Sequence, residues 1–194
     1  MYIRLLSFIL CCLAATDVSL AQKNTEKREI ESYTAAAVAD GSYKIDRYEY
    51  STGELIGNIF SSKGTILEDK KIDAYTISSD GNKILLETEH TPIYRRSYTA
   101  VCYVYDSKKD SVTPLACSQA VMCPTFSPDG TRVAYSLSND LYIQDLSTLK
   151  ITRLTSDGRH GSIINGTADW VYEEEFSIVK MYDWSPSGRY IGYV

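Results

Sequence analysis

The chain has 194 residues, 44% of them hydrophobic, which is enough to build the core of one ordinary domain. Its formal net charge of -5 and pI near 5.1 argue against nucleic acid as the main partner, because phosphates bind to a basic surface. Adjacent basic residues occur only as pairs, at 27–28, 70–71, 95–96 and 108–109. The composition therefore predicts a folded domain that does not bind DNA or RNA.

The N-terminus has the layout of a secretory signal peptide. Arg4 precedes the apolar run from Leu5 to Ala15, and Ser19 and Ala21 are small residues at the positions that signal peptidase reads. We expect residues 1–21 to be removed and the rest to be exported to the periplasm or the extracellular space. The apolar run is too short to span a membrane comfortably, and no later run is long enough. The residues before Cys11 match a lipoprotein signal poorly, so we do not expect a lipid anchor.

Three cysteines remain after this segment, Cys102, Cys117 and Cys123. An odd number allows at most one disulfide bridge. Their spacings contain no Cys-x-x-Cys pair and no histidine lies close in sequence, so a zinc site is not expected. Cys102 sits in a strand-like run, where a buried free thiol is the usual explanation. Phosphate-binding loops, paired metal carboxylates and dinucleotide fingerprints are also missing from the sequence, which predicts no metal and no cofactor.

The region after residue 21 is rich in Tyr, Ile, Val and Thr, and its apolar residues recur at every second position, as in strands. The pattern is clearest over residues 121–154. It predicts four short strands there, at Val121 to Phe126, Arg132 to Leu137, Leu141 to Asp145 and Ile151 to Leu154. Pro128-Asp129-Gly130 supplies a tight turn between the first two.

The turn recurs along the chain. Similar turns lie about 50 residues before and about 60 residues after Pro128-Asp129-Gly130, at Ser79-Asp80-Gly81 and Ser185-Pro186-Ser187-Gly188. Each interval is close to the length of one four-stranded propeller blade. The second interval is longer because of an insertion. We therefore predict an all-β fold, a partial β-propeller of four-stranded blades over residues 22–194, with about three blades and the last one cut off after Val194.

The insertion carries the acidic run Glu173-Glu174-Glu175, between Asp169-Trp170 and Phe176. A protonated amine offers three donors and a positive charge, and two rigid carboxylates can take two of those donors. We expect the aromatic neighbours to fix the backbone and to reduce the surrounding water. By itself such a run is most often a solvated acidic patch.

Two segments and the order of blades between them resemble the dipeptidyl peptidase IV branch of the prolyl oligopeptidase family. The run from Asn165 to Glu175 reads NGTADWVYEEE and resembles the double-glutamate motif of that branch. The run from Arg95 to Ala100 reads RRSYTA and is similar to the segment with the branch's propeller arginine. The resemblance covers essentially all of the chain after residue 21.

This resemblance implies a propeller that precedes an α/β-hydrolase domain in the same chain, and an enzyme that is usually a homodimer. It implies that Glu174 and Glu175 bind the α-ammonium of a peptide N-terminus and that Glu173 is structural. Arg95 would hydrogen-bond a substrate carbonyl or orient the two glutamates. The choice of Arg95 over Arg96 rests on its distance from Ser97.

Physical chemistry agrees with these roles. An α-amino group has a pKa near 8 and is largely protonated at neutral pH. A carboxylate pair at a fixed distance from a nucleophile would therefore bind the N-terminal amine and place the bond after the second residue at the nucleophile. Adjacent carboxylates repel each other, and a guanidinium such as that of Arg95 would offset the repulsion.

The catalytic elements of such an enzyme are not in this sequence. The nucleophile elbow Gly-x-Ser-x-Gly does not occur, and we expect His90 and His160 to be surface loop residues. We therefore predict that the chain alone does not hydrolyse peptides. The alternatives are a non-catalytic propeller that binds peptides or proteins, an inactive truncated product and, within the family, a tripeptidyl peptidase.

Overall fold

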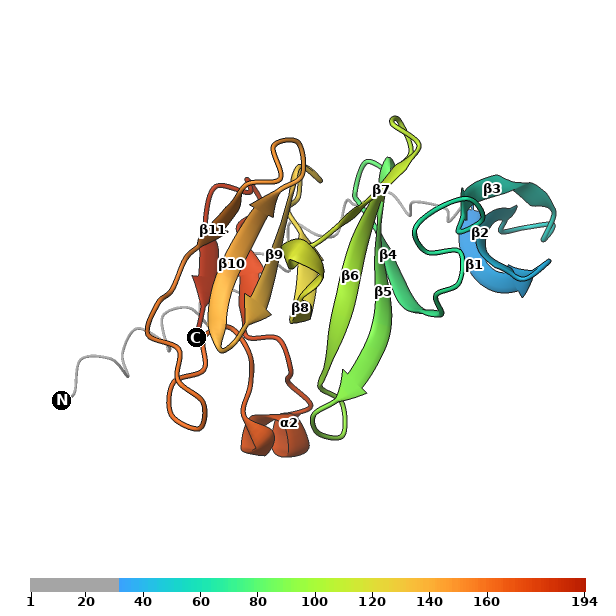
Figure 1. Cartoon of the computed structure of the whole chain (residues 1–194). Coiled ribbons are helices and arrows are strands. Elements are labelled where there is room, and N and C mark those ends of the chain that lie inside the picture. Colours follow the sequence, from blue (N-terminus) through green and yellow to red (C-terminus); the bar gives the residue numbers. More distant parts are fainter. Residues whose placement is uncertain (1–31) are drawn as a thin grey trace, which may run out of the picture.

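The computed structural model describes residues 32–194, and almost all of its regular structure is antiparallel β-sheet (Figure 1). This confirms the all-β prediction. The predicted signal peptide, residues 1–21, lies outside the described residues. Within residues 32–194, no helix has the length and apolar character needed to cross a membrane.

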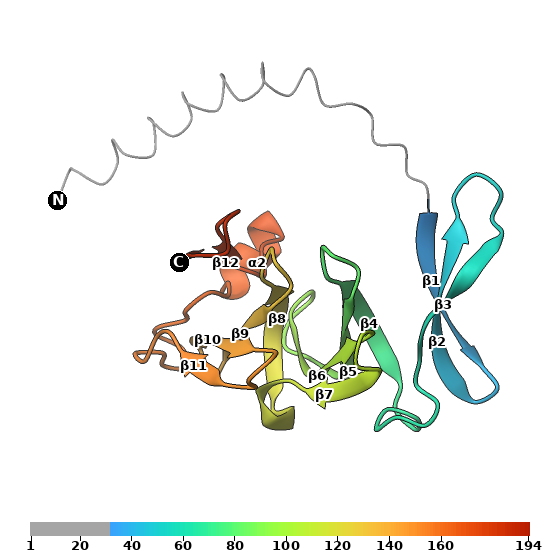
Figure 2. The same ribbon diagram turned by 90° about the horizontal axis from the view of Figure 1, so that it is seen from above.

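The first sheet has three strands, β1 (Ser32–Ala39), β2 (Ser42–Glu49) and β3 (Leu55–Ser61), in the order β1-β2-β3. Each pairs with its chain neighbour as a hairpin, and Gly41 takes the positive φ that the first tight turn requires. In Figure 2 this sheet stands beside the rest of the propeller.

Two complete four-stranded blades follow. The first consists of β4 (Ile72–Ile77), β5 (Lys83–Pro92), β6 (Tyr98–Asp106) and β7 (Ser111–Pro114). The second consists of β8 (Ala120–Phe126), β9 (Arg132–Leu137), β10 (Asp140–Asp145) and β11 (Ile151–Arg153). The short 3-10 turn η2 (Ala116–Ser118) connects the blades, and a two-pair ladder between β6 and β8 joins them. These blades confirm the predicted partial propeller.

After the second blade, the chain forms the insertion with its helix α2 (Trp170–Phe176) and then the hairpin of β12 (Tyr182–Trp184) and β13 (Ile191–Tyr193). The described residues thus contain four blade-like units in three sheets, since the β6–β8 ladder joins both complete blades into one sheet, whereas the turn spacing predicted about three blades. The first sheet escaped the count because it lacks the Ser-x-Asp/Ser-Gly turn that marks the others.

The recurring turn owes its shape to hydrogen bonds of its aspartate. Asp129 Oδ1 accepts from Ser127 Oγ at 2.6 Å and from the Thr131 N–H at 3.0 Å, and Gly130 has a φ of 65°. In the preceding blade, Asp80 makes the same bond to the hydroxyl of Ser78. Such bonds satisfy backbone donors that the turn leaves unpaired. Each repeat therefore fixes the end of one strand and the start of the next.

Of the three apolar clusters among the described residues, two pack against the first complete blade. One lies between the first sheet and the first complete blade, and the other lies between the two complete blades. The first includes Ile45, Phe60, Ile84 and Leu86, and the second includes Leu85, Cys102, Val121 and Tyr135. Because side chains of a strand alternate between its faces, β5 contributes to both clusters. Cys102 is a buried free thiol, as predicted, and the other two described cysteines are also unbridged.

Candidate functional site

The acidic run forms a helix of seven residues, α2, at the base of the second complete blade (Figure 1). Asp169 caps its N-terminus, where its carboxylate accepts from the Tyr172 N–H at 3.0 Å. Ser177 ends it in the left-handed conformation, with a φ of 57°. Both ends of α2 are therefore set by specific residues, as short helices require. Asp169 is thus a structural residue of α2.

The three glutamates differ sharply in burial because successive helical residues point about 100° apart. Glu173 is 1% exposed, Glu174 is half-buried and Glu175 is exposed. The aromatic neighbours do not shield the run as expected, because Trp170 and Phe176 are 56% and 64% exposed. Glu174 and Glu175 remain available to a ligand, and Glu173 does not.

Glu173 points at the hairpin between β5 and β6. Its Oε1 accepts from the backbone N–H groups of Arg96, at 2.5 Å, and Ser97, at 3.0 Å. Figure 1 shows the tip of this hairpin beside α2. Burial alone would raise the pKa of Glu173, but hydrogen bonding from Ser97 and Arg96 outweighs it and holds the pKa below its ordinary value. The carboxylate is thus ionised in the fold.

Arg95 reaches the next residue of the helix. Its Nη2 lies 3.2 Å from Glu174 Oε2, and 70% of the Arg95 side chain is exposed. Within residues 32–194, the side chain of Arg96 forms no ion pair. The structure therefore brings the side chain of Arg95, and not that of Arg96, to Glu174.

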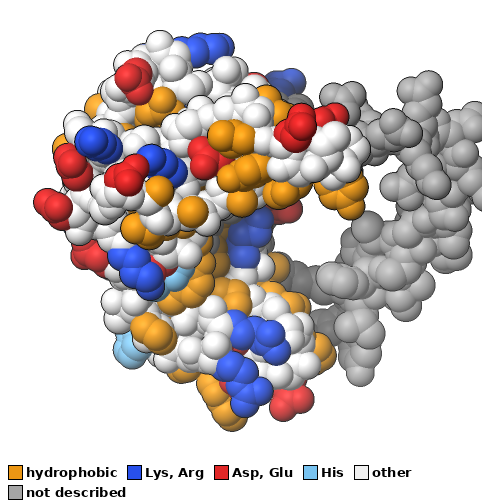
Figure 3. All heavy atoms as spheres, turned by 90° about the vertical axis from the view of Figure 1, so that its right-hand side faces the viewer, with side chains coloured by type: hydrophobic (Ala, Val, Ile, Leu, Met, Phe, Trp, Pro, Cys, Tyr) orange, Lys and Arg blue, Asp and Glu red, His pale blue; other side chains and the backbone are white. Residues whose placement is uncertain are grey.

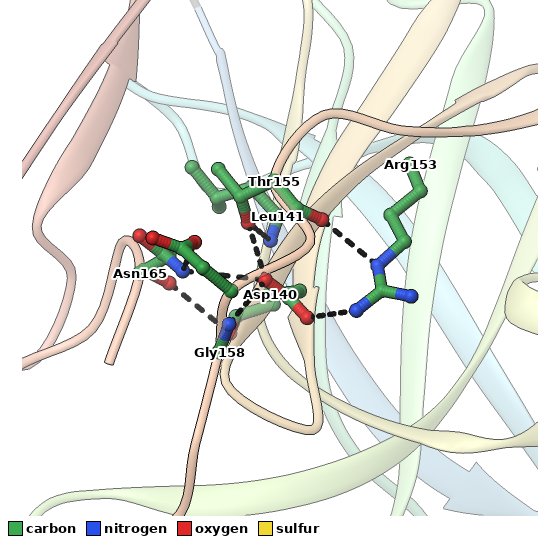
Figure 4. Close-up of polar contacts among 8 residues, drawn as sticks. Asp140, Leu141, Arg153, Thr155, Gly158 and Asn165 are labelled. Carbon is green, nitrogen blue, oxygen red and sulfur yellow. Dashed lines mark hydrogen bonds and ion pairs between the residues drawn. The ribbon is translucent and has the colours of Figure 1, made fainter. Parts of the chain in front are cut away.

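The insertion that leads to α2 is held by a buried polar network around Asp140, which is 1% exposed (Figure 4). Its Oδ1 accepts from Thr155 Oγ1 at 2.7 Å, the Gly158 N–H at 3.0 Å and Asn165 Nδ2 at 3.2 Å. Arg153 pairs with Oδ2. One carboxylate thus fixes both the start of the insertion and the turn before α2. Asn165 is committed to this network, although Asn165-Gly166-Thr167 matches a glycosylation sequon.

A cavity of about 360 Å³ lies between the blades, next to the hairpin and the segment after α2. Its lining includes Glu87, Arg96, Tyr98, Cys123 and Lys180. Glu87 accepts hydrogen bonds from Tyr98 Oη and faces His90 Nε2, each at 3.1 Å. His90 was predicted in a surface loop, and this is wrong: it lies in β5 and stacks on Tyr98.

Charges of both signs cover the molecular surface. On the face in Figure 3, acidic and basic side chains are interspersed with apolar ones, without one broad basic patch. In residues 32–194, no group of three or more His, Cys, Asp or Glu side chains is placed to hold a metal ion.

The sequence matches the family described as the dipeptidyl peptidase IV N-terminal region over residues 78–194. The chain belongs to this dipeptidyl peptidase IV family. It is 35% identical to dipeptidyl peptidase 4 of Felis catus over 176 residues, which is 88% of this chain. It is 30% identical over 191 residues to the prolyl endopeptidase FAP of Homo sapiens. The crystal structure of Porphyromonas gingivalis dipeptidyl peptidase 4 matches 81% of the chain with a TM-score of 0.72 and 34% identity.

The chain covers about a quarter of the length of these dipeptidyl peptidase IV relatives. The chain spans 23% of the feline protein, 25% of the human one and 24% of the bacterial crystal structure. Membership of the family thus accounts for the propeller blades.

Sequence reasoning missed Ser97 and Asp140, whose contacts complete the site. Ser97 belongs to the motif that was noted for its arginines, and Asp140 lies directly before the strand predicted from Leu141. A serine or an aspartate in the sequence does not by itself predict such a hydrogen bond, because the partner lies 76 residues away for Ser97 and up to 25 residues away for Asp140.

Proposed function

We propose that this chain is the N-terminal propeller portion of an exported serine exopeptidase that releases dipeptides of the Xaa-Pro or Xaa-Ala type from peptide N-termini. To that enzyme the chain contributes the residues that bind the α-ammonium group of the substrate, Arg95, Glu174 and Glu175, which we call the amine clamp. The observation that carries the proposal is the ion pair between Arg95 and Glu174, 3.2 Å long, beside the exposed Glu175. Membership of the dipeptidyl peptidase IV family supports the reaction class.

The clamp suits an α-ammonium group. Glu174 and Glu175 are consecutive on α2 and can accept two of its three N–H donors in charge-assisted hydrogen bonds. Arg95 uses Nη2 toward Glu174, and a guanidinium has further donors that could bind a substrate carbonyl oxygen. An internal peptide segment lacks the ammonium and would leave Glu175 without a cationic partner and Glu174 with Arg95 alone.

Cleavage requires a nucleophile that the 194 residues do not supply as a Gly-x-Ser-x-Gly elbow. In this proposal the nucleophile belongs to a hydrolase domain in the same polypeptide. The chain of 194 residues should therefore bind peptide N-termini without hydrolysing them.

The test measures binding of the tripeptide Gly-Pro-Ala by NMR titration of the ¹⁵N-labelled chain. We expect shifts in α2 and the 93–97 hairpin with the free amine and none with the N-acetylated peptide. Glu174→Gln and Glu175→Gln should each weaken binding, since each removes one charge that pairs with the ammonium. Equal binding of the free and acetylated peptides would contradict the proposal, as would turnover of a glycyl-prolyl chromogenic substrate that survives both substitutions.

A second candidate is a non-catalytic propeller that binds peptides. The missing nucleophile elbow favours it. The coding sequence after Val194 separates the two candidates: a continuing frame with Ser, Asp and His in hydrolase order supports the exopeptidase, and an intact stop codon supports the binding module.

A further inference from the structure

Glu173 joins the two parts of the amine clamp. It lies on α2, directly before Glu174, and it accepts from the N–H of Arg96, the residue directly after Arg95. The Glu173–Arg96 hydrogen bond and the Glu174–Arg95 ion pair therefore involve adjacent residues in both the helix and the hairpin, although the two segments are 77 residues apart in sequence.

The two contacts differ in strength. The Arg95 side chain is 70% exposed, so its ion pair with Glu174 is weakened by water and screened by salt. The Glu173 carboxylate is 1% exposed and receives two N–H groups, and charge-assisted hydrogen bonds are stronger in such surroundings. The buried contact therefore fixes the geometry, and the exposed ion pair follows from it.

Few polar contacts hold the 93–97 hairpin against α2. Among the described residues, the hydrogen bonds and ion pairs between α2 and residues 93–97 are these three alone. Inside the hairpin, the N–H of Ile93 donates to the Ser97 carbonyl at 2.9 Å, while the N–H groups of Arg96 and Ser97 turn toward the helix. Without an acceptor, these two donors would lose their partner in a partly dry site.

We propose that Glu173 is a positioning residue of the clamp. It holds Arg95 against Glu174 and sets the rotation of α2 that leaves Glu174 and Glu175 open, without touching the substrate. Its effect on amine binding rests on the function proposed above, whereas its effect on the hairpin does not.

The remaining atoms of the contact guide the choice of variants. Glu173 Oε2 and Ser97 Oγ are both buried without a hydrogen-bond partner among the described residues. Glu173→Gln keeps an acceptor oxygen and removes the charge, and Glu173→Ala removes both. The matched control is Gln144→Ala, because Gln144 also tethers backbone: its Oε1 accepts from the Ala116 N–H at 2.8 Å, away from the clamp.

The experiment uses the ¹⁵N-labelled chain and has two readouts. The first, without ligand, is hydrogen exchange of the Arg96 and Ser97 amides and the contacts of the Arg95 side chain with α2 in nuclear Overhauser spectra. The second is affinity for Gly-Pro-Ala. Glu173→Ala should speed exchange of both amides, remove the Arg95 contacts and weaken binding by about tenfold or more. Glu173→Gln should fall between wild type and Glu173→Ala. Gln144→Ala should leave both readouts unchanged.

Protection of amides in β8 to β10 reports that each variant is folded. Retained Arg95 contacts and slow exchange in folded Glu173→Ala would overturn the inference, whether or not the wild type binds amines. Lost contacts with unchanged affinity would also overturn it. Failure of the wild type to prefer the free amine would instead defeat the proposed function, and the ligand-free readout would then decide the role of Glu173.

Discussion

Arg132 of one blade lies over the indole ring of Trp184 in the next sheet, with its guanidinium carbon 4.9 Å from the ring centroid. Its Nη2 also donates to the Gly188 carbonyl at 2.7 Å. Both partners belong to the hairpin of β12 and β13, which has only two strands of its own. Arg132 therefore helps to attach the last hairpin to the complete blade before it, together with the hydrogen bonds that Tyr182 and Trp184 donate to β8 and β9.

Arg132→Ala should destabilise the chain by about 1–3 kcal/mol, because it removes a hydrogen bond and a cation–π contact together. Arg132→Lys keeps the charge but loses the planar donor group, so an intermediate loss is expected. The free energy of unfolding from urea titration measures both. Exposed Lys109→Ala serves as the control, and an Arg132→Ala loss no larger than that of the control would contradict the contact.

Gly166 stands where the insertion turns toward α2, with a φ of 79°. A Cβ there would lie 2.5 Å from Leu141 Cδ2, which is closer than side chains pack. Gly166→Ala should therefore cost about 1–3 kcal/mol from backbone strain, with further loss from the clash. Gly192→Ala is the matched control, because nothing lies within 4 Å of its Cβ position. Equal thermal midpoints for the two variants would show that this turn is not restrained.

Asp169 provides the N-cap of α2. Asp169→Ala should destabilise the helix by about 1 kcal/mol, and Asp169→Ser should restore most of this loss. In a helix of seven residues, that loss is enough to increase fraying. The Cα chemical shifts of residues 170–176 measure it. Helical shifts that stay unchanged in Asp169→Ala would mean that tertiary contacts alone hold α2.

Acid should destabilise the fold through carboxylates whose pKa is depressed. The Ser127 hydroxyl and the Thr131 N–H lower the pKa of Asp129 to about 2. Burial would raise the pKa of Asp140, but hydrogen bonds from Thr155 and Arg153 outweigh it and lower the pKa. Because these folded pKa values lie below the unfolded ones, their contribution to stability is complete above about pH 5 and is lost as pH falls toward 2.

Urea midpoints measured between pH 7 and pH 2.5 test this. Asp129→Asn should lower the midpoint at pH 7 and flatten its decline with acid, since the variant has no carboxylate to protonate. A midpoint that is constant down to pH 2.5 in the wild type would contradict the predicted loss.

Local patterns in the sequence were sufficient for the blades. Alternating apolar residues and the Ser127-to-Gly130 turn predicted β8 to β11 almost residue by residue, because strand periodicity and turn chemistry are properties of short segments. The first sheet was undercounted and His90 was misplaced, since neither follows from a turn motif.

The acidic run was visible in the sequence, and so was its similarity to a known motif. What the sequence could not do was tell Glu173 from Glu174 and Glu175 by physical reasoning, because three adjacent glutamates have the same chemistry. Helix rotation and the position of a hairpin 77 residues away decide that Glu173 is buried on backbone N–H groups and that Glu174 meets Arg95. Composition and local pattern thus determined the strands and the residue types of the site, whereas burial and long-range pairing, which exist only in the folded chain, decided the role of each carboxylate.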